Sequence, residues 1–136
     1  MSELPRKPRP QFRNIHVSQI LSYRLPIAGV MSILHRISGA GMFLLLPVIV
    51  WLFDLSLTSE LSYATLMELT DLVLVKLILC GLAWAFIHHF FGGVRHLISD
   101  LHLGITKESS PQIATIFMGL SLVVSLLAWL AIFGVL

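Results

Sequence analysis

Charged residues are scarce in this sequence of 136 residues, because only 12% are Asp, Glu, Lys or Arg while 57% are apolar. Soluble domains carry about 25% charged residues. A share of 12% is too small to cover the surface of a water-soluble domain with charged side chains. The composition therefore argues against a soluble enzyme, a nucleic-acid-binding protein and a disordered chain. Cysteine is scarce too: Cys80 stands alone, so an internal disulfide is impossible.

Three long apolar segments account for this composition. They run over about residues 27–53, 68–97 and 112–136. A helix that crosses a membrane needs about 20 mainly apolar residues at about 1.5 Å of rise each. The sequence therefore predicts an all-α membrane protein with three transmembrane helices. A hairpin of buried soluble helices is the alternative, and the length of the segments disfavours it.

The first 26 residues differ from the rest. Residues 1–11 are rich in proline and basic residues and are expected to be extended, whereas residues 12–25 mix apolar and polar types and are expected to lie along the membrane surface. The basic residues are not followed by the apolar core of a signal peptide. We therefore expect a tail and interfacial segment over 1–26 and a three-helix transmembrane domain over 27–136. A bacterial inner membrane fits this pattern, with the mitochondrial inner membrane as the alternative.

Basic residues are distributed unevenly along the chain. Six of the nine lie within residues 1–36, whereas residues 54–71 hold four acidic residues and no basic one. Two more, Arg95 and Lys107, lie in the next loop. Because lysine and arginine concentrate in cytoplasmic loops, we expect the N-terminus in the cytoplasm and the C-terminus outside.

Ionisable side chains occur within the first two predicted spans. A charged side chain at membrane depth costs about 2.5–3.5 kcal/mol on insertion scales, so such residues are candidates for function. The two helices run antiparallel and bring these side chains to one depth near the cytoplasmic side. Haem ligation, proton transfer and structural pairing with backbone carbonyls are the three interpretations of the histidines. The residues concerned are His35, Arg36, His88, His89, Arg95 and His96.

Small residues surround one of these histidines. Gly81, Ala85, His89 and Gly93 follow each other at a spacing of four, so they share one helix face. A porphyrin needs a flat, open wall beside its axial ligand, and this stripe is a candidate for one. Close helix packing explains the small residues equally well, but not the histidine. His88 lies about 100° away around the helix, in bulkier surroundings.

Further polar residues lie near the predicted cytoplasmic rim. Arg95 and His96 suit anionic groups, either haem propionates or lipid head groups. On the first span, Ser32 and Arg36 are separated by one helical turn, with His35 beside them. A hydroxyl and a guanidinium together donate well to a carbonyl oxygen. An arginine that reaches out to lipid phosphate is the alternative.

Two motifs resemble a known family. SILHRISG at 32–39 and HHFFGGVRHLISD at 88–100 are similar to the two signatures of the cytochrome b anchor subunit of succinate dehydrogenase. The number and order of spans extend the resemblance over nearly the whole chain. It implies an anchor of respiratory complex II that pairs with a second hydrophobic anchor subunit and holds a flavoprotein and an iron–sulfur subunit. Electrons from succinate would pass to ubiquinone, and one haem b would lie between the two anchors.

The resemblance also assigns roles to single residues. The iron ligand is the histidine four residues before the glycine of G-x-RH, which here is His89. The second axial ligand is expected from the other anchor subunit. The residues implied for haem b are His89, His35, Arg36 and His96, and those for the quinone are Ser32, Arg36, Leu25 and Ile20.

The sequence is also compatible with three other functions. A fumarate reductase anchor is the nearest alternative, because sequence does not fix the direction of a reversible reaction. A haem-free structural anchor is another, and a small transporter subunit is a third. The transporter predicts a polar path across the whole membrane, and apart from Lys76 the outer halves of the spans lack one. In every case the chain contacts membrane lipid, no nucleic acid is expected, and no catalytic residue is assigned to the isolated chain.

Overall fold

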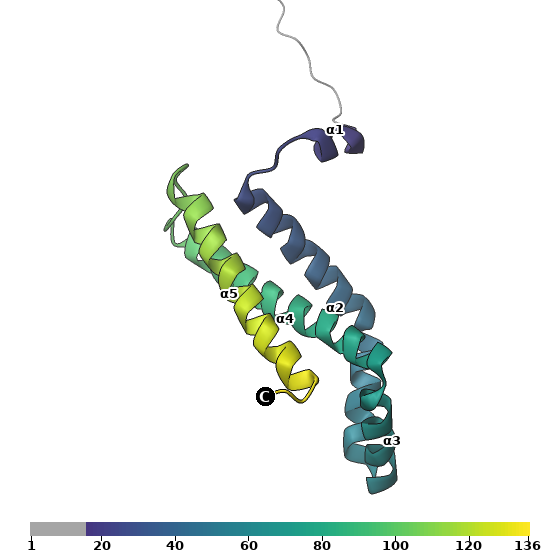
Figure 1. Ribbon diagram of the computed structural model, residues 1–136. Coiled ribbons are helices and arrows are strands. Elements are labelled where there is room, and N and C mark those ends of the chain that lie inside the picture. Colours follow the sequence, from purple (N-terminus) through teal and green to yellow (C-terminus); the bar gives the residue numbers. More distant parts are fainter. Residues whose placement is uncertain (1–15) are drawn as a thin grey trace, which may run out of the picture.

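The computed structural model describes residues 16–136. These residues form five helices: α1 (Val17–Ser22), α2 (Ile27–Thr58), α3 (Glu60–Asp71), α4 (Val73–Asp100) and α5 (Ser109–Ile132). Figure 1 shows α1 and α3 at opposite ends of the molecule, and α4 contacts α2, α3 and α5. Within the described range there is no β-strand. The all-helical fold class predicted from the sequence is therefore confirmed.

Three of the helices, α2, α4 and α5, are long and apolar enough to cross a membrane. The 24 residues of α5 extend about 36 Å, more than the hydrocarbon core of about 30 Å. Most large apolar side chains on these helices point outward, and Phe43 and Leu44 are each 74% exposed. Such a surface suits lipid or other membrane subunits as neighbours. The predicted number of spans is confirmed, while their orientation in the membrane stays a prediction.

The structure shows where two of the spanning helices begin, α2 after Pro26 and α5 at Ser109. Pro26 precedes α2, and its carbonyl oxygen accepts from the N–H groups of Gly29 and Val30 at 2.8 and 3.1 Å. Proline is suited to a helix start because it has no N–H to leave unpaired there. The last helix, α5, begins at Ser109, three residues before the predicted start of the third span at about residue 112.

The acidic stretch from residue 54 to 71, expected as a loop, is helical for most of its length. Only Ser59 separates α2 from α3. Its Oγ accepts a hydrogen bond from the backbone N–H of Ser62 at 3.1 Å and so caps α3. Ser62 Oγ in turn donates to the carbonyl oxygen of Leu55 at 2.9 Å, which holds α3 against the end of α2. The prediction of a loop over these residues is therefore wrong.

The N-terminal segment is described only in part. The short helix α1 is capped by His16, whose ring accepts from the N–H of Ser18 at 3.3 Å. Its placement along the membrane surface stays a prediction. The proline-rich tail over residues 1–11 lies outside the described residues, and the same holds for the side chain of Ile20.

The contacts between helices use small and polar side chains. Interhelical hydrogen bonds also contribute: the indole Nε1 of Trp129 donates to the carbonyl oxygen of Cys80 at 2.8 Å. Small residues let membrane helices approach closely where the hydrophobic effect does not draw them together. This geometry fits Cys80 as a packing residue. The side chains with at most 1% exposure are Met31, Ser38, His88, Ala114, Ser121 and Ser125.

Candidate functional site

Three imidazole rings meet between α2 and α4. The rings of His35 and His89 stack with their centroids 4.1 Å apart and their planes inclined by 11°. The ring of His96 lies 5.2 Å from that of His35, tilted by 55°. The expectation that the two antiparallel helices bring these histidines to one depth is therefore confirmed. We call His35, His89 and His96 the histidine cluster.

The hydrogen bond of His89 fixes which of its nitrogens carries the proton. Its Nδ1 lies 3.0 Å from the carbonyl oxygen of His35 and 3.4 Å from Ser38 Oγ. A carbonyl oxygen only accepts, so Nδ1 is the protonated nitrogen and donates. The hydroxyl of Ser38 donates to the same carbonyl oxygen at 2.8 Å. In the neutral imidazole Nε2 of His89 is then the nitrogen without a proton, and neutral imidazole is the form that binds a metal.

Two glycines make room for the stacked rings. A Cβ atom at Gly39 of α2 would lie 2.8 Å from Cε1 of His89. A Cβ atom at Gly92 of α4 would overlap the ring of His35. Each ring therefore lies directly against the backbone of the opposite helix, and a side chain at either glycine would displace it. Gly92 is not among the site residues predicted from the sequence, although the Gly-Gly pair in the second motif is a visible signal.

The stripe of small residues on α4 is only partly open. A Cβ atom at Gly81 or Gly93 would meet nothing within 4 Å. Ala85, however, is only 8% exposed, because the rest of the chain covers it. Residues spaced by four drift around a helix by about 40° per step, so the stripe does not stay on one side. The predicted continuous wall is therefore wrong at Ala85, and open space remains at Gly93, one turn beyond His89.

His88 points toward α5. It is 1% exposed, and its Nδ1 lies 3.2 Å from Ser121 Oγ. The Ser121 hydroxyl donates to the carbonyl oxygen of Met118 at 2.8 Å, so it accepts from His88. The ring of Trp84 stacks on that of His88 at 5.4 Å. Nε2 of His88 is enclosed without a partner in the described part of the chain.

Arg95 also turns toward α5 and is only 9% exposed. Its Nη2 donates to Ser110 Oγ, at the start of α5, over 3.2 Å. Arg95 and His96 are the two residues considered for the cytoplasmic rim, and of these Arg95 lies in the interface between α4 and α5. His96 is exposed and contacts the histidine cluster through His35.

The residues considered for a quinone lie around the start of α2. Ser32 is half-buried and Arg36 is exposed, one turn further along the helix. Both flank His35, so the structure places them beside the histidine cluster. Leu25 is half-buried in the segment that precedes α2. Ile20 belongs to α1, but the position of its side chain is not described.

Comparison with known families decides the class of protein. Residues 6–128 match the family described as succinate dehydrogenase/fumarate reductase transmembrane subunit. The chain belongs to this family. It is a multi-pass membrane anchor and a cytochrome b-type subunit of the succinate dehydrogenase complex, complex II.

Three relatives show how far the similarity extends. The anchor is 29% identical to the succinate dehydrogenase cytochrome b556 subunit of Paracoccus denitrificans over 133 residues, which covers 98% of each chain. It is 32% identical to the cytochrome b556 subunit of Rickettsia bellii over 87 residues, covering 64% of this chain and 67% of the relative. It is 29% identical to the cytochrome b560 subunit of Reclinomonas americana over 114 residues, covering 79% and 78%.

Proposed function

We propose that this anchor binds haem b together with the second anchor subunit and forms part of the ubiquinone site of complex II. His89 would hold the haem iron, and Ser32 and Arg36 would bind the quinone head group. The names of the relatives, cytochrome b556 and cytochrome b560, support a haem b. When bound, the haem supplies a one-electron centre near the quinone. The quinone receives its electrons from succinate through the flavoprotein and the iron–sulfur subunit.

The observation that carries the haem proposal is the hydrogen bond from His89 Nδ1 to the carbonyl oxygen of His35. Metal-ligating histidines nearly always donate their other ring N–H to a carboxylate, a backbone carbonyl or a water. That bond fixes the tautomer and the ring orientation before iron arrives. His88 fits less well, because its Nε2 is enclosed by the chain's own atoms and offers no room for iron.

The other three residues proposed for the haem site would contribute to it in different ways. Arg36 is exposed beside the histidine cluster, and His96 is the exposed member of that cluster, so both are able to meet the carboxylates of a haem. Nε2 of His35 is enclosed without a partner among residues 16–136. His35 therefore contributes to the haem site chiefly through its carbonyl oxygen and its stacked ring.

The quinone proposal rests on the donors of Ser32 and Arg36. A quinone carbonyl oxygen gains negative charge as the quinone is reduced. A guanidinium and a hydroxyl that donate to this oxygen would stabilise that charge more strongly than they stabilise the neutral carbonyl, which favours reduction. Leu25 and Ile20 would supply apolar contacts upstream of these donors.

The distribution of basic residues supports one orientation of the chain in the membrane. We infer that the N-terminus and the α4–α5 loop face the cytoplasm of a bacterium, and that the C-terminus lies outside. The histidine cluster and Arg36 then lie at the membrane side on which the iron–sulfur and flavoprotein subunits dock. This placement gives the quinone the short distance to an iron–sulfur cluster that electron transfer requires.

A reduced-minus-oxidised absorption spectrum of the purified complex tests the proposal. His89→Ala should remove or strongly alter the b-type haem signal, while His88→Ala, the matched control, should leave it nearly intact. The reverse pattern would transfer the ligand to His88. A wild-type complex without any b-type signal would favour the haem-free structural anchor instead.

A further inference from the structure

Three adjoining hollows surround the first part of α4, at the end of the helix opposite to the histidine cluster. All three are lined by Leu79. At about 1.5 Å per residue, Lys76 lies about 20 Å before His89 along α4. The charged end of these hollows is therefore distant from the proposed haem and quinone sites, whereas the second hollow extends along α4 as far as Phe86, three residues before His89.

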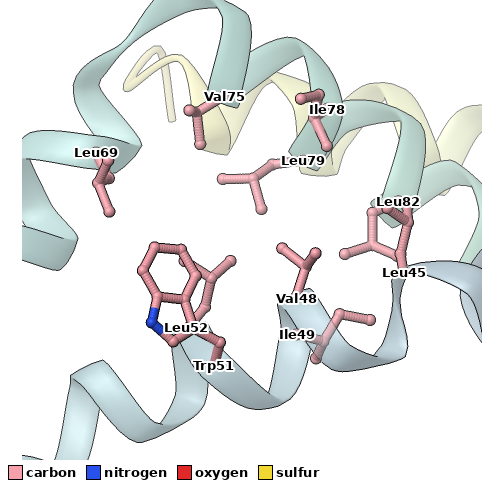
Figure 2. Close-up of a pocket in the computed structure, with 10 residues that line it drawn as sticks. All are labelled: Leu45, Val48, Ile49, Trp51, Leu52, Leu69, Val75, Ile78, Leu79 and Leu82. Carbon is pink, nitrogen blue, oxygen red and sulfur yellow. The ribbon is translucent and has the colours of Figure 1, made fainter.

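The first hollow lies between α2, α3 and α4 and has a volume of about 120 Å³. Figure 2 shows Trp51 and Leu52 of α2 facing Leu69 of α3 and Val75 and Leu79 of α4. No charged side chain lines this hollow, so water would find few hydrogen-bond partners there. Its full lining is Leu45, Val48, Ile49, Trp51, Leu52, Leu69, Val75, Ile78, Leu79 and Leu82.

A second apolar hollow adjoins the first. It lies between α2, α4 and the end of α5, where Met42, Phe86 and Ile132 line it, and its volume is about 410 Å³. The two hollows share Ile49, Leu79 and Leu82. Two apolar spaces therefore lie next to each other, as two acyl chains of one lipid would.

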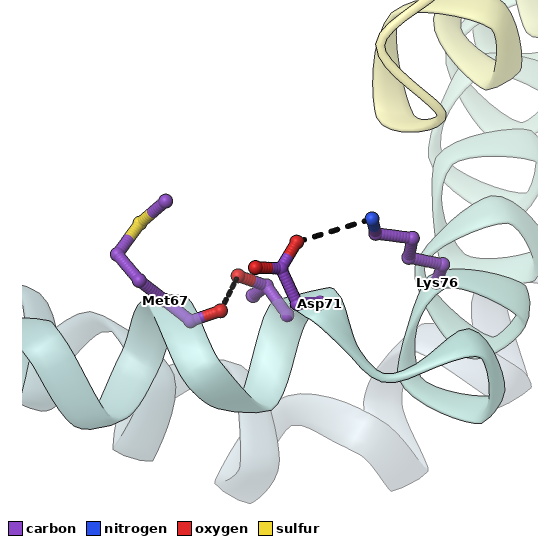
Figure 3. Close-up of polar contacts among 4 residues, drawn as sticks. Met67, Asp71 and Lys76 are labelled. Carbon is purple, nitrogen blue, oxygen red and sulfur yellow. Dashed lines mark hydrogen bonds and ion pairs between the residues drawn. The ribbon is translucent and has the colours of Figure 1, made fainter.

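The third hollow is polar at one edge and has a volume of about 390 Å³. Lys76 Nζ lies 3.2 Å from Asp71 Oδ1, and both residues line this space together with Thr70 and Gly134. Figure 3 shows this pair where α3 passes into α4. The two side chains are 24% and 78% exposed, respectively. An ammonium has three donors and a carboxylate accepts several hydrogen bonds, so each partner keeps capacity for a ligand.

We propose that these hollows bind one zwitterionic glycerophospholipid with the chemistry of phosphatidylethanolamine. Its phosphate contacts Lys76, its ammonium group contacts Asp71, and its acyl chains occupy the two apolar hollows. The charge pattern selects this occupant, because Lys76 and Asp71 offer one cationic and one anionic group side by side. An acidic phospholipid would satisfy Lys76 but leave Asp71 facing added negative charge.

The position of the charged pair agrees with a lipid head group. Lys76 lies in the first turn of α4, and its long apolar stem lets the ammonium reach the membrane interface. Asp71 is the last residue of α3. The polar edge thus lies at the helix ends. The first apolar hollow begins at the same level, at Val75, and extends to Leu82, and the second extends further along α4 to Phe86.

Native mass spectrometry of the purified, intact complex tests the proposal. After a detergent wash, the wild-type complex should retain one phosphatidylethanolamine. Val48→Trp fills the first hollow from α2 and should abolish this retention. Val50→Trp is the matched control, because Val50 is 57% exposed and lines none of the three hollows. Lys76→Gln removes a charge-assisted contact without adding bulk and should weaken retention about tenfold.

Reconstitution in nanodiscs of phosphatidylcholine with added phosphatidylethanolamine or phosphatidylglycerol tests the head group. Phosphatidylethanolamine should be retained in preference to phosphatidylglycerol. Equal or better retention of phosphatidylglycerol would overturn the assignment, as would a wild-type complex that retains no lipid or equal effects of Val48→Trp and Val50→Trp. Crosslinking of position 48 to the second anchor subunit would also overturn it, because that subunit would then occupy the hollow. Haem content, measured on the same samples, shows that each variant is assembled.

Discussion

His35 contacts His89 twice: its carbonyl oxygen lies 3.0 Å from His89 Nδ1, and its ring stacks on that of His89 at 4.1 Å. One residue of α2 thereby fixes both the proton position and the ring plane of a residue of α4. A backbone carbonyl in a helix is a rigid acceptor, so the imidazole is oriented before any ligand binds. The proposed binding of haem iron by His89 depends on this contact.

Substitution of Gly39 tests the contact sterically. In Gly39→Val a Cβ atom would lie 2.8 Å from Cε1 of His89, so the ring must move. We expect the b-type haem absorption of the purified complex to be shifted or reduced. Gly41→Val on the same helix is the control, because a Cβ atom at Gly41 would meet nothing within 4 Å. An unchanged spectrum in Gly39→Val would show that the ring position does not matter for the haem.

Ser121→Ala tests a structural role for His88. The change leaves the buried Nδ1–H of His88 without its acceptor on α5. Interhelical hydrogen bonds in membranes contribute about 0.6 kcal/mol on average and at most about 1.7 kcal/mol. We therefore expect a modest drop in the thermal stability of the complex, with the haem spectrum retained.

Ser125→Ala is the matched control for this change. Its hydroxyl donates to the carbonyl oxygen of Ser121 within the same helix, at 2.6 Å, so no bond between helices is lost. Stability should stay close to that of the wild type. Loss of the haem signal in Ser121→Ala would instead place His88 in the haem site.

Arg36→Leu tests the quinone proposal. The change removes a cationic donor to the quinone carbonyl oxygen, which gains negative charge as the quinone is reduced. Loss of one such donor lowers turnover about 10²–10³-fold in other enzymes. We expect quinone reduction by succinate to fall strongly, while succinate oxidation by an artificial acceptor at the flavin stays unchanged. Subunit and haem content must be measured on the same sample, since Arg36 is also proposed to contact the haem.

Arg24→Leu provides the control for the lost charge. Arg24 is exposed in the segment before α2 and belongs to none of the proposed sites. It should leave quinone reduction nearly unchanged. Wild-type quinone reduction in an assembled Arg36→Leu complex would remove Arg36 from the quinone site.

The orientation of the chain is testable with reporter fusions in bacteria. Alkaline phosphatase is active only outside the cytoplasm, so a fusion after Leu136 should be active. A fusion within the α4–α5 loop, near Lys107, should be inactive. Activity in the opposite pattern would invert the topology inferred from the basic residues.

The sequence predicts the spans well and the segment between them poorly. Long apolar runs identify α2, α4 and α5 because membrane burial depends on length and hydropathy alone. The helix α3 has only moderate apolar character, with Glu60, Glu68 and Asp71 within its 12 residues. Its stability depends on the cap at Ser59 and the contact with Leu55, which are local geometry rather than composition.

The candidate site was likewise predictable in part: residue spacing predicts which side chains meet, but not the backbone contacts and the packing around them. The spacing of His35 and His89 in antiparallel spans predicts that they approach each other, and they do. The hydrogen bond between them involves a backbone carbonyl, which every residue carries and no motif distinguishes. Likewise, the burial of Ala85 depends on which helix covers it, so the spacing of small residues alone overstates the open wall.

The most direct test of the account is chemical rescue of the His89 ligand. In His89→Gly the complex should lose its b-type haem spectrum, and added imidazole should restore it by binding in the vacated space. The same imidazole should leave the wild type and His88→Gly unchanged. A normal haem spectrum in His89→Gly without imidazole would contradict the assignment of His89 as the iron ligand.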